Sequence, residues 1–205
     1  PRMLCKSRYV CTGAAIAISI EAAGDLTLSN QSSIFARSLG AGTSGLVEVS
    51  ASTIQITGGS QIITESRTTG LAGDITLTAQ GALVIAGTNS TGTPSSVQTI
   101  GPSGAITISA SDVRLDDRAV IYSTTSSAGA AGDITITTDN LTITNGGGIV
   151  TSGGDVFSSG NIHITATNVI SLQGQFDLSH LSRIANENGA SGGTGNIVVE
   201  TKDLL

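Results

Sequence analysis

The sequence has 205 residues and a net charge of −6 at pH 7, which argues against nucleic-acid binding because Lys and Arg supply most of that affinity. Hydrophobic residues make up 39% of the chain, so it has too much apolar surface for simple disorder. No apolar run approaches the ~18 residues that a membrane-spanning helix requires.

Residues 1–12 do not fit the pattern of the remaining sequence, and we expect a non-repeat N-terminal segment or cap there. This segment contains both cysteines of the chain, Cys5 and Cys11. They could form a disulfide that closes a small loop in a secreted protein, or remain as two buried thiols. Without a nearby His they make a poor zinc site.

From residue 13 onward the sequence repeats. Each clear copy opens with a Gly, and a weaker copy starts near Gly13. The intervals between successive clear copies are 28, 31, 28, 28 and 35 residues, counted between Gly45, Gly73, Gly104, Gly132, Gly160 and Gly195. A repeat period of 20–50 residues is typical of solenoids, propellers or arrays.

Apolar residues alternate within each copy with a period of two, which indicates half-buried strands and not helices. In the copy that opens at Gly132, Ile134 and Ile136 begin one run, Leu141 and Ile143 form a second, and a third follows. The parity changes between runs, so the chain turns a corner at each change while the same face stays inward.

Three short strands per 28 residues predict an all-β fold, a single-stranded parallel β-helix (β-solenoid) of six to seven coils. Residues 13–205 would form this one repeat domain, with like residues aligned in ladders along its inside. The final letters, TKDLL, enter a new second strand, so we expect the domain to be a fragment of a longer chain.

The corners of the coils are rich in Asn and Asp, which tolerate a left-handed backbone and bond their own main chain. We predict such turns at Thr53, Asp74, Asp112, Asp133, Asn140, Asn161, Asn168 and Asn196. The Gly that opens each copy is predicted to need a positive φ.

Three longer segments, 88–104, 124–132 and 180–195, are assigned to the third corner of their coils. Lengthening an exposed loop costs little, because the entropy of closure grows only with the logarithm of its length. We expect these loops on one side of the rod, and loops of this kind carry specific recognition.

Asp116, Asp117 and Arg118 could supply paired carboxylates for general acid and base chemistry. The residues expected beside them in neighbouring coils complete no site; these are Thr57, Gly58, Thr144 and Asn145. A solvated corner with a local salt bridge is therefore the favoured interpretation.

The segment FDLSHLSR gathers Ser, His and Asp, but a triad needs a strained nucleophile and an oriented base, which adjacent loop residues rarely provide. A local polar loop is favoured for its polar residues, which are Asp177, Ser179, His180, Ser182 and Arg183. His163 is expected at the surface without metal partners. No catalytic, cofactor-binding or metal-binding residue is assigned, and no cofactor is expected.

Outward positions of the first strand form a Thr-rich ladder that looks similar to the flat Thr-x-Thr arrays of β-solenoid ice-binding proteins. Exposed strands also favour Thr for other reasons, so ice binding is an alternative. Its members are Glu48, Ser50, Thr76, Thr78, Thr107, Ser109, Thr135, Thr137, His163 and Thr165, of which Glu48 and His163 interrupt the pattern.

Two further patterns leave alternatives open. A single Gly-Asp pair per copy, as at Asp74 and Asp133, is sparser than the repeats that bind calcium, so calcium is a weak alternative. An outward position of the third strand is apolar, at Ile63, Tyr122 and Val150. Either loops cover this stripe or it is a contact surface between rods.

The units AGDITITTDNLTITNGGGIVTSGG and GNIHITATNVISLQGQ resemble the repeat region of filamentous haemagglutinin-like exoproteins, the large secreted partners of two-partner secretion systems. The resemblance covers roughly Gly13 to Leu205 and implies a right-handed β-helix stalk of a bacterial surface or secreted adhesin. The family's N-terminal secretion domain is not recognisable in this sequence.

We therefore predict a non-catalytic structural or adhesive module, secreted or on the bacterial cell surface, that presents loops for attachment or forms fibres. Its end coils could self-associate, because their strand edges are unpaired. The expected receptor is a surface glycan or protein. The alternatives are a polysaccharide-active β-helix enzyme and an ice-binding protein.

Overall fold

The computed structural model describes residues 3–4, 17–125, 129–154, 156–177, 179–188 and 191–205. These residues form strands and turns, and no helix occurs among them. The predictions for Cys5, Cys11 and Gly13, and most of the expected cap, lie outside the described residues.

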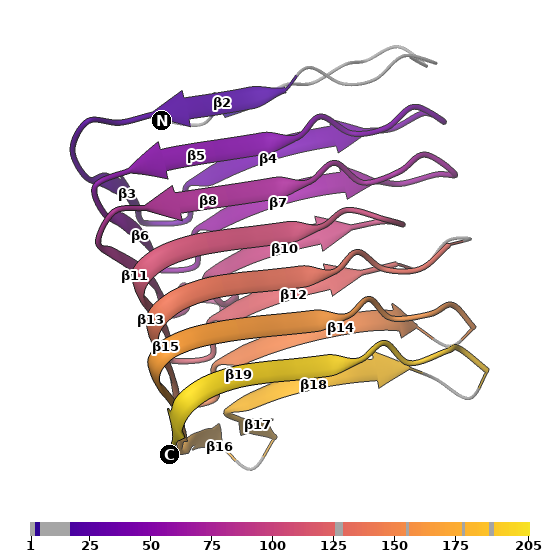
Figure 1. Ribbon diagram of the computed structural model, residues 1–205. Helices are drawn as coiled ribbons and strands as arrows, with labels where there is room; N and C mark the ends of the chain where they lie inside the picture. Colours follow the sequence, from indigo (N-terminus) through magenta and orange to yellow (C-terminus); the bar gives the residue numbers. More distant parts are fainter. Residues whose placement is uncertain (1–2, 5–16, 126–128, 155, 178, 189–190) are drawn as a thin grey trace.

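The chain winds as a right-handed coil of parallel strands, with the N-terminal coils at one end of a rod and the C-terminal coils at the other (Figure 1). The first strands of successive coils stack in one sheet: β2 (Ile18–Glu21), β5 (Val47–Ala51), β8 (Ile75–Ala79), β11 (Ile106–Asp116), β13 (Ile134–Thr144), β15 (Ile162–Gln173) and β19 (Ile197–Leu204). The parallel β-solenoid predicted from the repeat is confirmed.

The second strands are β3 (Leu26–Leu28), β6 (Ile54–Thr57), β9 (Ala82–Ala86) and the later halves of β11, β13 and β15. The third strands form a sheet opposite the first: β1 (Met3–Leu4), β4 (Ser33–Ser38), β7 (Gln61–Ser66), β10 (Ser96–Ile100), β12 (Val120–Thr124), β14 (Gly148–Gly154) and β18 (Arg183–Asn188). A short antiparallel hairpin, β16 (Gln175–Asp177) with β17 (His180–Leu181), stands outside these sheets.

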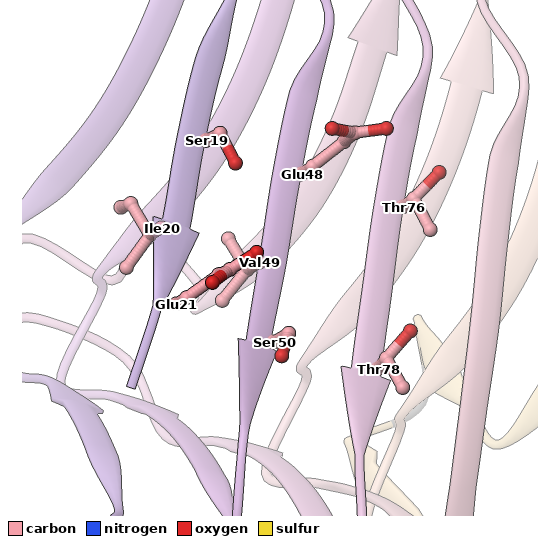
Figure 2. Close-up of a pocket in the computed structure, with 8 residues that line it drawn as sticks. All are labelled: Ser19, Ile20, Glu21, Glu48, Val49, Ser50, Thr76 and Thr78. Carbon is pink, nitrogen blue, oxygen red and sulfur yellow. The ribbon is translucent and has the colours of Figure 1, made fainter. Parts of the chain in front are cut away.

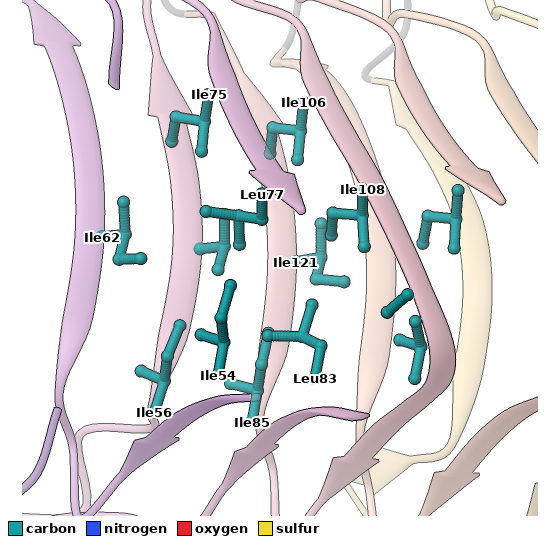
Figure 3. Close-up of a cluster of buried hydrophobic side chains, with 14 of the residues drawn as sticks. Ile54, Ile56, Ile62, Ile75, Leu77, Leu83, Ile85, Ile106, Ile108 and Ile121 are labelled. Carbon is teal, nitrogen blue, oxygen red and sulfur yellow. The ribbon is translucent and has the colours of Figure 1, made fainter. Parts of the chain in front are cut away.

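The space between the sheets is filled by aliphatic ladders. Ile75 lies in register with Ile106, and Leu77 with Ile108, as Figure 3 shows. Nearly all of these side chains are inaccessible to solvent. Because burying one such side chain contributes roughly 1.5–3 kcal/mol, the repeated ladder is the main source of stability.

The glycines that open each copy do not have a positive φ, so that prediction is wrong. Their requirement is close stacking between coils. A Cβ added to Gly132 would lie well inside contact with the carbonyl oxygen of Gly104, and one added to Gly160 would meet the carbonyl of Gly132 in the same way. Thr151 inside the rod donates its hydroxyl to the carbonyl of Gly160 at 2.9 Å.

The Asn and Asp corner residues are not left-handed either. The side-chain hydrogen bonds of Thr53, Asp74, Asp112, Asp133, Asn140 and Asn161 reach an adjacent coil and not their own turn. The Asp74 Oδ1 accepts the backbone N–H of Ala105 at 2.9 Å, and the Asp133 Oδ1 accepts that of Asn161 at 2.7 Å. The positive φ angles gather at the second corner, at Asn30, Gln31, Gly58, Gly59, Asp117, Arg118, Asn145 and Gly146.

The long insertions lie at the second corner, not the third as predicted. Three residues form this corner in most coils, for example 117–119 and 145–147, whereas 87–95 and 174–182 each supply nine. The interval between Gly73 and Gly104 is only three residues longer than the period, because a shorter third corner in this coil offsets most of the insertion at the second corner. Nine positions separate Thr64 from Gly73, but five separate Thr99 from Gly104. The segment 124–132 does follow the third strand.

Gly132→Ala tests the stacking requirement. We expect it to lower the free energy of unfolding by about 3 kcal/mol, because the new methyl group would force neighbouring coils apart. Gly24→Ala is the matched control, since nothing lies within 4 Å of a Cβ at that position. Chemical denaturation of both variants measures the difference, and equal effects would contradict the explanation.

Candidate functional site

Both insertions lie at the second corner, where Arg118 bonds each of them and one recess is lined by residues of both. We call residues 87–95, 174–177, 179–182, Arg118 and Gly146 the second-corner site. Arg118 belongs to the corner between β11 and β12, and Gly146 to the corner between β13 and β14. The hairpin β16–β17 forms the second insertion, near the C-terminal end of the rod (Figure 1).

Arg118 joins the two insertions. Its backbone is left-handed, with a φ of 64°, and its N–H donates to the carbonyl of Asn145 at 3.0 Å. The guanidinium donates from Nη1 to the carbonyl oxygen of Gly92 at 3.2 Å and from Nη2 to the Nε2 of His180 at 3.0 Å. Its Cζ also lies 5.5 Å from the ring centroid of Phe176, within the range of a cation–π interaction.

The contact with Arg118 determines the protonation of His180. A guanidinium can only donate hydrogen bonds, so the Nε2 of His180 must accept with its lone pair. The ring proton is therefore on Nδ1, which donates to the Asp177 Oδ1 at 2.7 Å. His180 is thus a neutral imidazole held between a cation and an anion.

The carboxylate of Asp177 is fixed by two donors. The hydrogen bond from His180 and then that from the backbone N–H of Ser179, at 2.8 Å, hold the pKa of Asp177 below its ordinary value. No serine hydroxyl is hydrogen-bonded to the His180 Nε2 among the described residues, because the Arg118 Nη2 bonds that atom. Ser182 instead donates to the carbonyl of Gln173 at 2.8 Å. The site contains an Asp–His pair without a hydroxyl nucleophile on it.

Gly146 allows the hairpin to approach the rod. Its φ is 77°, and its N–H donates to the Ser182 Oγ at 3.2 Å. A Cβ at Gly146 would lie 2.7 Å from the carbonyl oxygen of His180 and 2.9 Å from the Phe176 Cβ. Both the backbone conformation and the space available therefore require glycine.

A recess of about 100 Å³ lies between the insertions. Pro94 contributes to it from the first insertion, His180 and Leu181 from the hairpin, and Arg118 and Arg183 from the rod. Arg183 forms an ion pair with Glu187 at 2.8 Å. The recess thus combines two guanidinium groups with apolar wall residues.

Asp116 is bound within its own corner and to the next coil. Its side chain accepts hydrogen bonds from Arg114 at 2.6 Å, Thr144 at 2.9 Å and Asn145 at 2.8 Å. Burial raises the pKa of Asp116, but these donors outweigh it and hold the pKa below its ordinary value. The salt-bridge partner is Arg114 and not Arg118.

Of the residues predicted beside Asp116 in the neighbouring coils, those on one side are confirmed and those on the other side are not. Thr144 and Asn145 are present on one side, but the coil on the other side contributes Ala86 in register. Thr57 lies one coil further away, opposite Ala86. The copy that opens at Gly73 has one extra residue before its second strand, so Leu83 and not Ala82 lies in register with Val113.

The outward ladder of the first strands is in register as predicted. Figure 2 shows Ser19, Glu48 and Thr76 in one row, and the register continues this row to Thr107, Thr135, His163 and Val198. A shallow hollow of about 210 Å³ lies over the first three coils, between Glu21 and Glu48. His163 is exposed, with Nε2 3.3 Å from the Thr165 hydroxyl.

The outer face of the third-strand sheet holds a charge cluster that the sequence reasoning missed. Glu65 is nearly buried and pairs with Arg37 at 2.6 Å and Arg67 at 2.5 Å. Arg37 also lies over the Phe35 ring at 4.2 Å. The separation of 28 residues between Arg37 and Glu65, one repeat period, was the available signal.

The positions of the predicted apolar stripe, beside this cluster, are aligned from coil to coil. They are occupied by Phe35, Ile63, Gln98, Tyr122 and Val150, of which Gln98 is polar. Val150 is buried, whereas Ile63 and Tyr122 are half-buried.

Within the part of the chain that the structure describes, no three or more His, Cys, Asp or Glu side chains gather as a metal site would require. The same residues include no helix with the length and apolar character to cross a membrane. Comparison of this chain with models of protein families, with curated proteins and with solved structures finds no match.

Asp116→Asn tests the role of this carboxylate. Because its pKa is lowered in the folded protein, its stabilising effect is present above about pH 4 and is lost as the pH falls through the folded-state value. We expect the variant to be less stable by about 1 kcal/mol at neutral pH, since the group is near the surface.

Unfolding by urea at several pH values measures this difference, which should shrink as the pH falls below about 4 and the carboxylate becomes protonated in the folded protein. Asp203→Asn, at an exposed position of β19, is the control. A difference that grows as the pH falls would contradict the assignment.

Proposed function

We propose that this chain is a non-catalytic structural and adhesive β-helix module of a secreted or surface-exposed bacterial protein, with the second-corner site as its contact surface for a glycan. The observation that carries the proposal is the presence of two nine-residue insertions at a corner that has three or four residues in the other described coils. Arg118 bonds both of them. Insertions held together on a rigid scaffold are typical of recognition surfaces.

The chemistry of the site suits a sugar. Phe176 and Leu181 of the hairpin are 47% and 55% exposed, and they border polar groups of His180 and Arg118. An aromatic ring beside fixed hydrogen-bonding groups can contact the apolar face and the hydroxyl groups of a sugar together. Arg183, which is also paired with Glu187, adds a guanidinium to the recess that would favour acidic sugars.

The proposal assigns no catalytic role to His180 or Asp116, because hydrogen bonds within the protein engage both side chains. The His180 Nε2, which a general base would use, is bonded to Arg118. Both carboxylate oxygens of Asp116 accept hydrogen bonds from its own corner and the next coil. Neither group is free to exchange a proton with a substrate in this arrangement.

The double variant Phe176→Ala/Leu181→Ala tests the proposal on an array of neutral and acidic oligosaccharides. We expect at least a tenfold loss of the binding that the unmodified chain shows, because the apolar contacts of the hairpin are removed. Both chains should unfold at nearly the same temperature, since the two side chains are outside the core.

Leu39→Ala/Leu71→Ala is the matched control, because these residues are similarly exposed, at 55% and 46%, but lie near the third corner. The control should bind as the unmodified chain does. No glycan binding by the unmodified chain, or an equal loss in both double variants, would contradict the proposal.

A further inference from the structure

We propose that His180 is a pH-dependent latch that holds the β16–β17 hairpin against the rod while it carries one ring proton and releases the hairpin when it takes up a second. The inference concerns the regulation of the second-corner site, and only its biological meaning rests on the proposed function.

The two hydrogen bonds of the His180 ring belong to different parts of the molecule. Asp177 is on the same hairpin as His180, so the bond at 2.7 Å between them can persist whether the hairpin is docked or released. Arg118 belongs to the rod, so its bond to the His180 Nε2 at 3.0 Å exists only in the docked hairpin. The ring therefore connects a carboxylate of the hairpin to a cation of the rod.

The docked and released hairpins differ in the protons they can hold. Docking requires a lone pair on Nε2, because the guanidinium only donates. A second ring proton removes this lone pair and places an imidazolium beside Arg118, where the like charges repel. In the released hairpin Asp177 remains beside the imidazolium and stabilises it. The released state thus binds more protons, and docking weakens as the pH falls.

The other charged groups around the ring do not reverse this direction. Arg183 of β18 lines the same recess, and its ion pair with Glu187 at 2.8 Å offsets part of its charge. Asp117, which directly precedes Arg118, is not among the residues that line the recess. Asp116, two residues before Arg118, is engaged by Arg114, and Asn145 and Gly146 of the neighbouring corner are uncharged. Asp177, whose pKa is lowered, stays ionised while histidine titrates between about pH 5 and about pH 8.

Besides the close packing of Phe176 and His180 on Gly146, few other contacts hold the hairpin. Phe176 lies over Arg118 at 5.5 Å, and the Gly146 N–H donates to Ser182 at 3.2 Å. Phe176 and Leu181 remain about half exposed, so the hairpin buries little apolar surface. One hydrogen bond from a charged donor is therefore a large part of its attachment, and segments with few buried contacts open at low free-energy cost.

A nitroxide label on the hairpin measures docking without any receptor present. Gln175→Cys in a Cys5→Ser/Cys11→Ser background places the label on an exposed residue of β16, outside the recess. We expect an immobile electron paramagnetic resonance spectrum at about pH 8 and at least a tenfold lower ratio of docked to released hairpin at about pH 5. A second label at Thr137→Cys on β13 should stay unchanged, which shows that the rod remains folded.

Two variants remove the response in different ways. His180→Gln can still accept from Arg118 and donate to Asp177 but cannot take up a second proton, so its spectrum should not change with pH. Arg118→Gln should leave the hairpin mobile at both pH values. An unmodified hairpin that stays docked at about pH 5, or a pH response that persists in either variant, would overturn the latch. Loss of glycan binding with an intact latch would instead contradict only the proposed function.

Discussion

Parallel strands stack about 4.8 Å apart, and in this rod that spacing applies to every corner as well as to every strand. At the third corner the main chains of successive coils come so close that a single Cβ on Gly132 would overlap the carbonyl of Gly104. The aliphatic ladders can be continuous only because these corners close. The stability of the rod and the repeat in the sequence both depend on this contact between coils.

The same constraint decides which side chains are available for function. Asp74, Asp133 and Asp116 look like exposed carboxylates in the sequence, but each accepts hydrogen bonds from the adjacent coil. The second corner is different because its left-handed residues turn the chain without a stacked glycine ladder, so six additional residues fit there in two coils. Specific chemistry therefore gathers where the packing between coils is least restrictive.

The fold could be predicted from the sequence because alternation and period are local signals that report which face of a strand is buried. Ile75, Ile106 and Ile134 were aligned correctly by counting from the opening glycine. Counting failed where two length changes in one coil nearly cancelled, as between Gly73 and Gly104. Between Gly160 and Gly195 the excess length is visible, but segment 180–195 was assigned to the third corner. His180 was therefore predicted in a different corner from Arg118, although the two side chains are hydrogen-bonded across 62 residues of sequence. The close contact between opening glycines of successive coils could not be predicted either, because it depends on the backbone positions of the stacked coils.

The stacking itself is tested most directly by distances between spin labels along the ladder of first strands. Labels at Glu21→Cys and Glu200→Cys, in the background without native cysteines, are six strand spacings apart, and we expect about 29 Å between their backbones. A pair at Ser50→Cys and Thr165→Cys spans four spacings and should give about 19 Å. Double electron–electron resonance distances that increase by about 5 Å per coil would support the account. Distances that do not scale with the number of coils would contradict it.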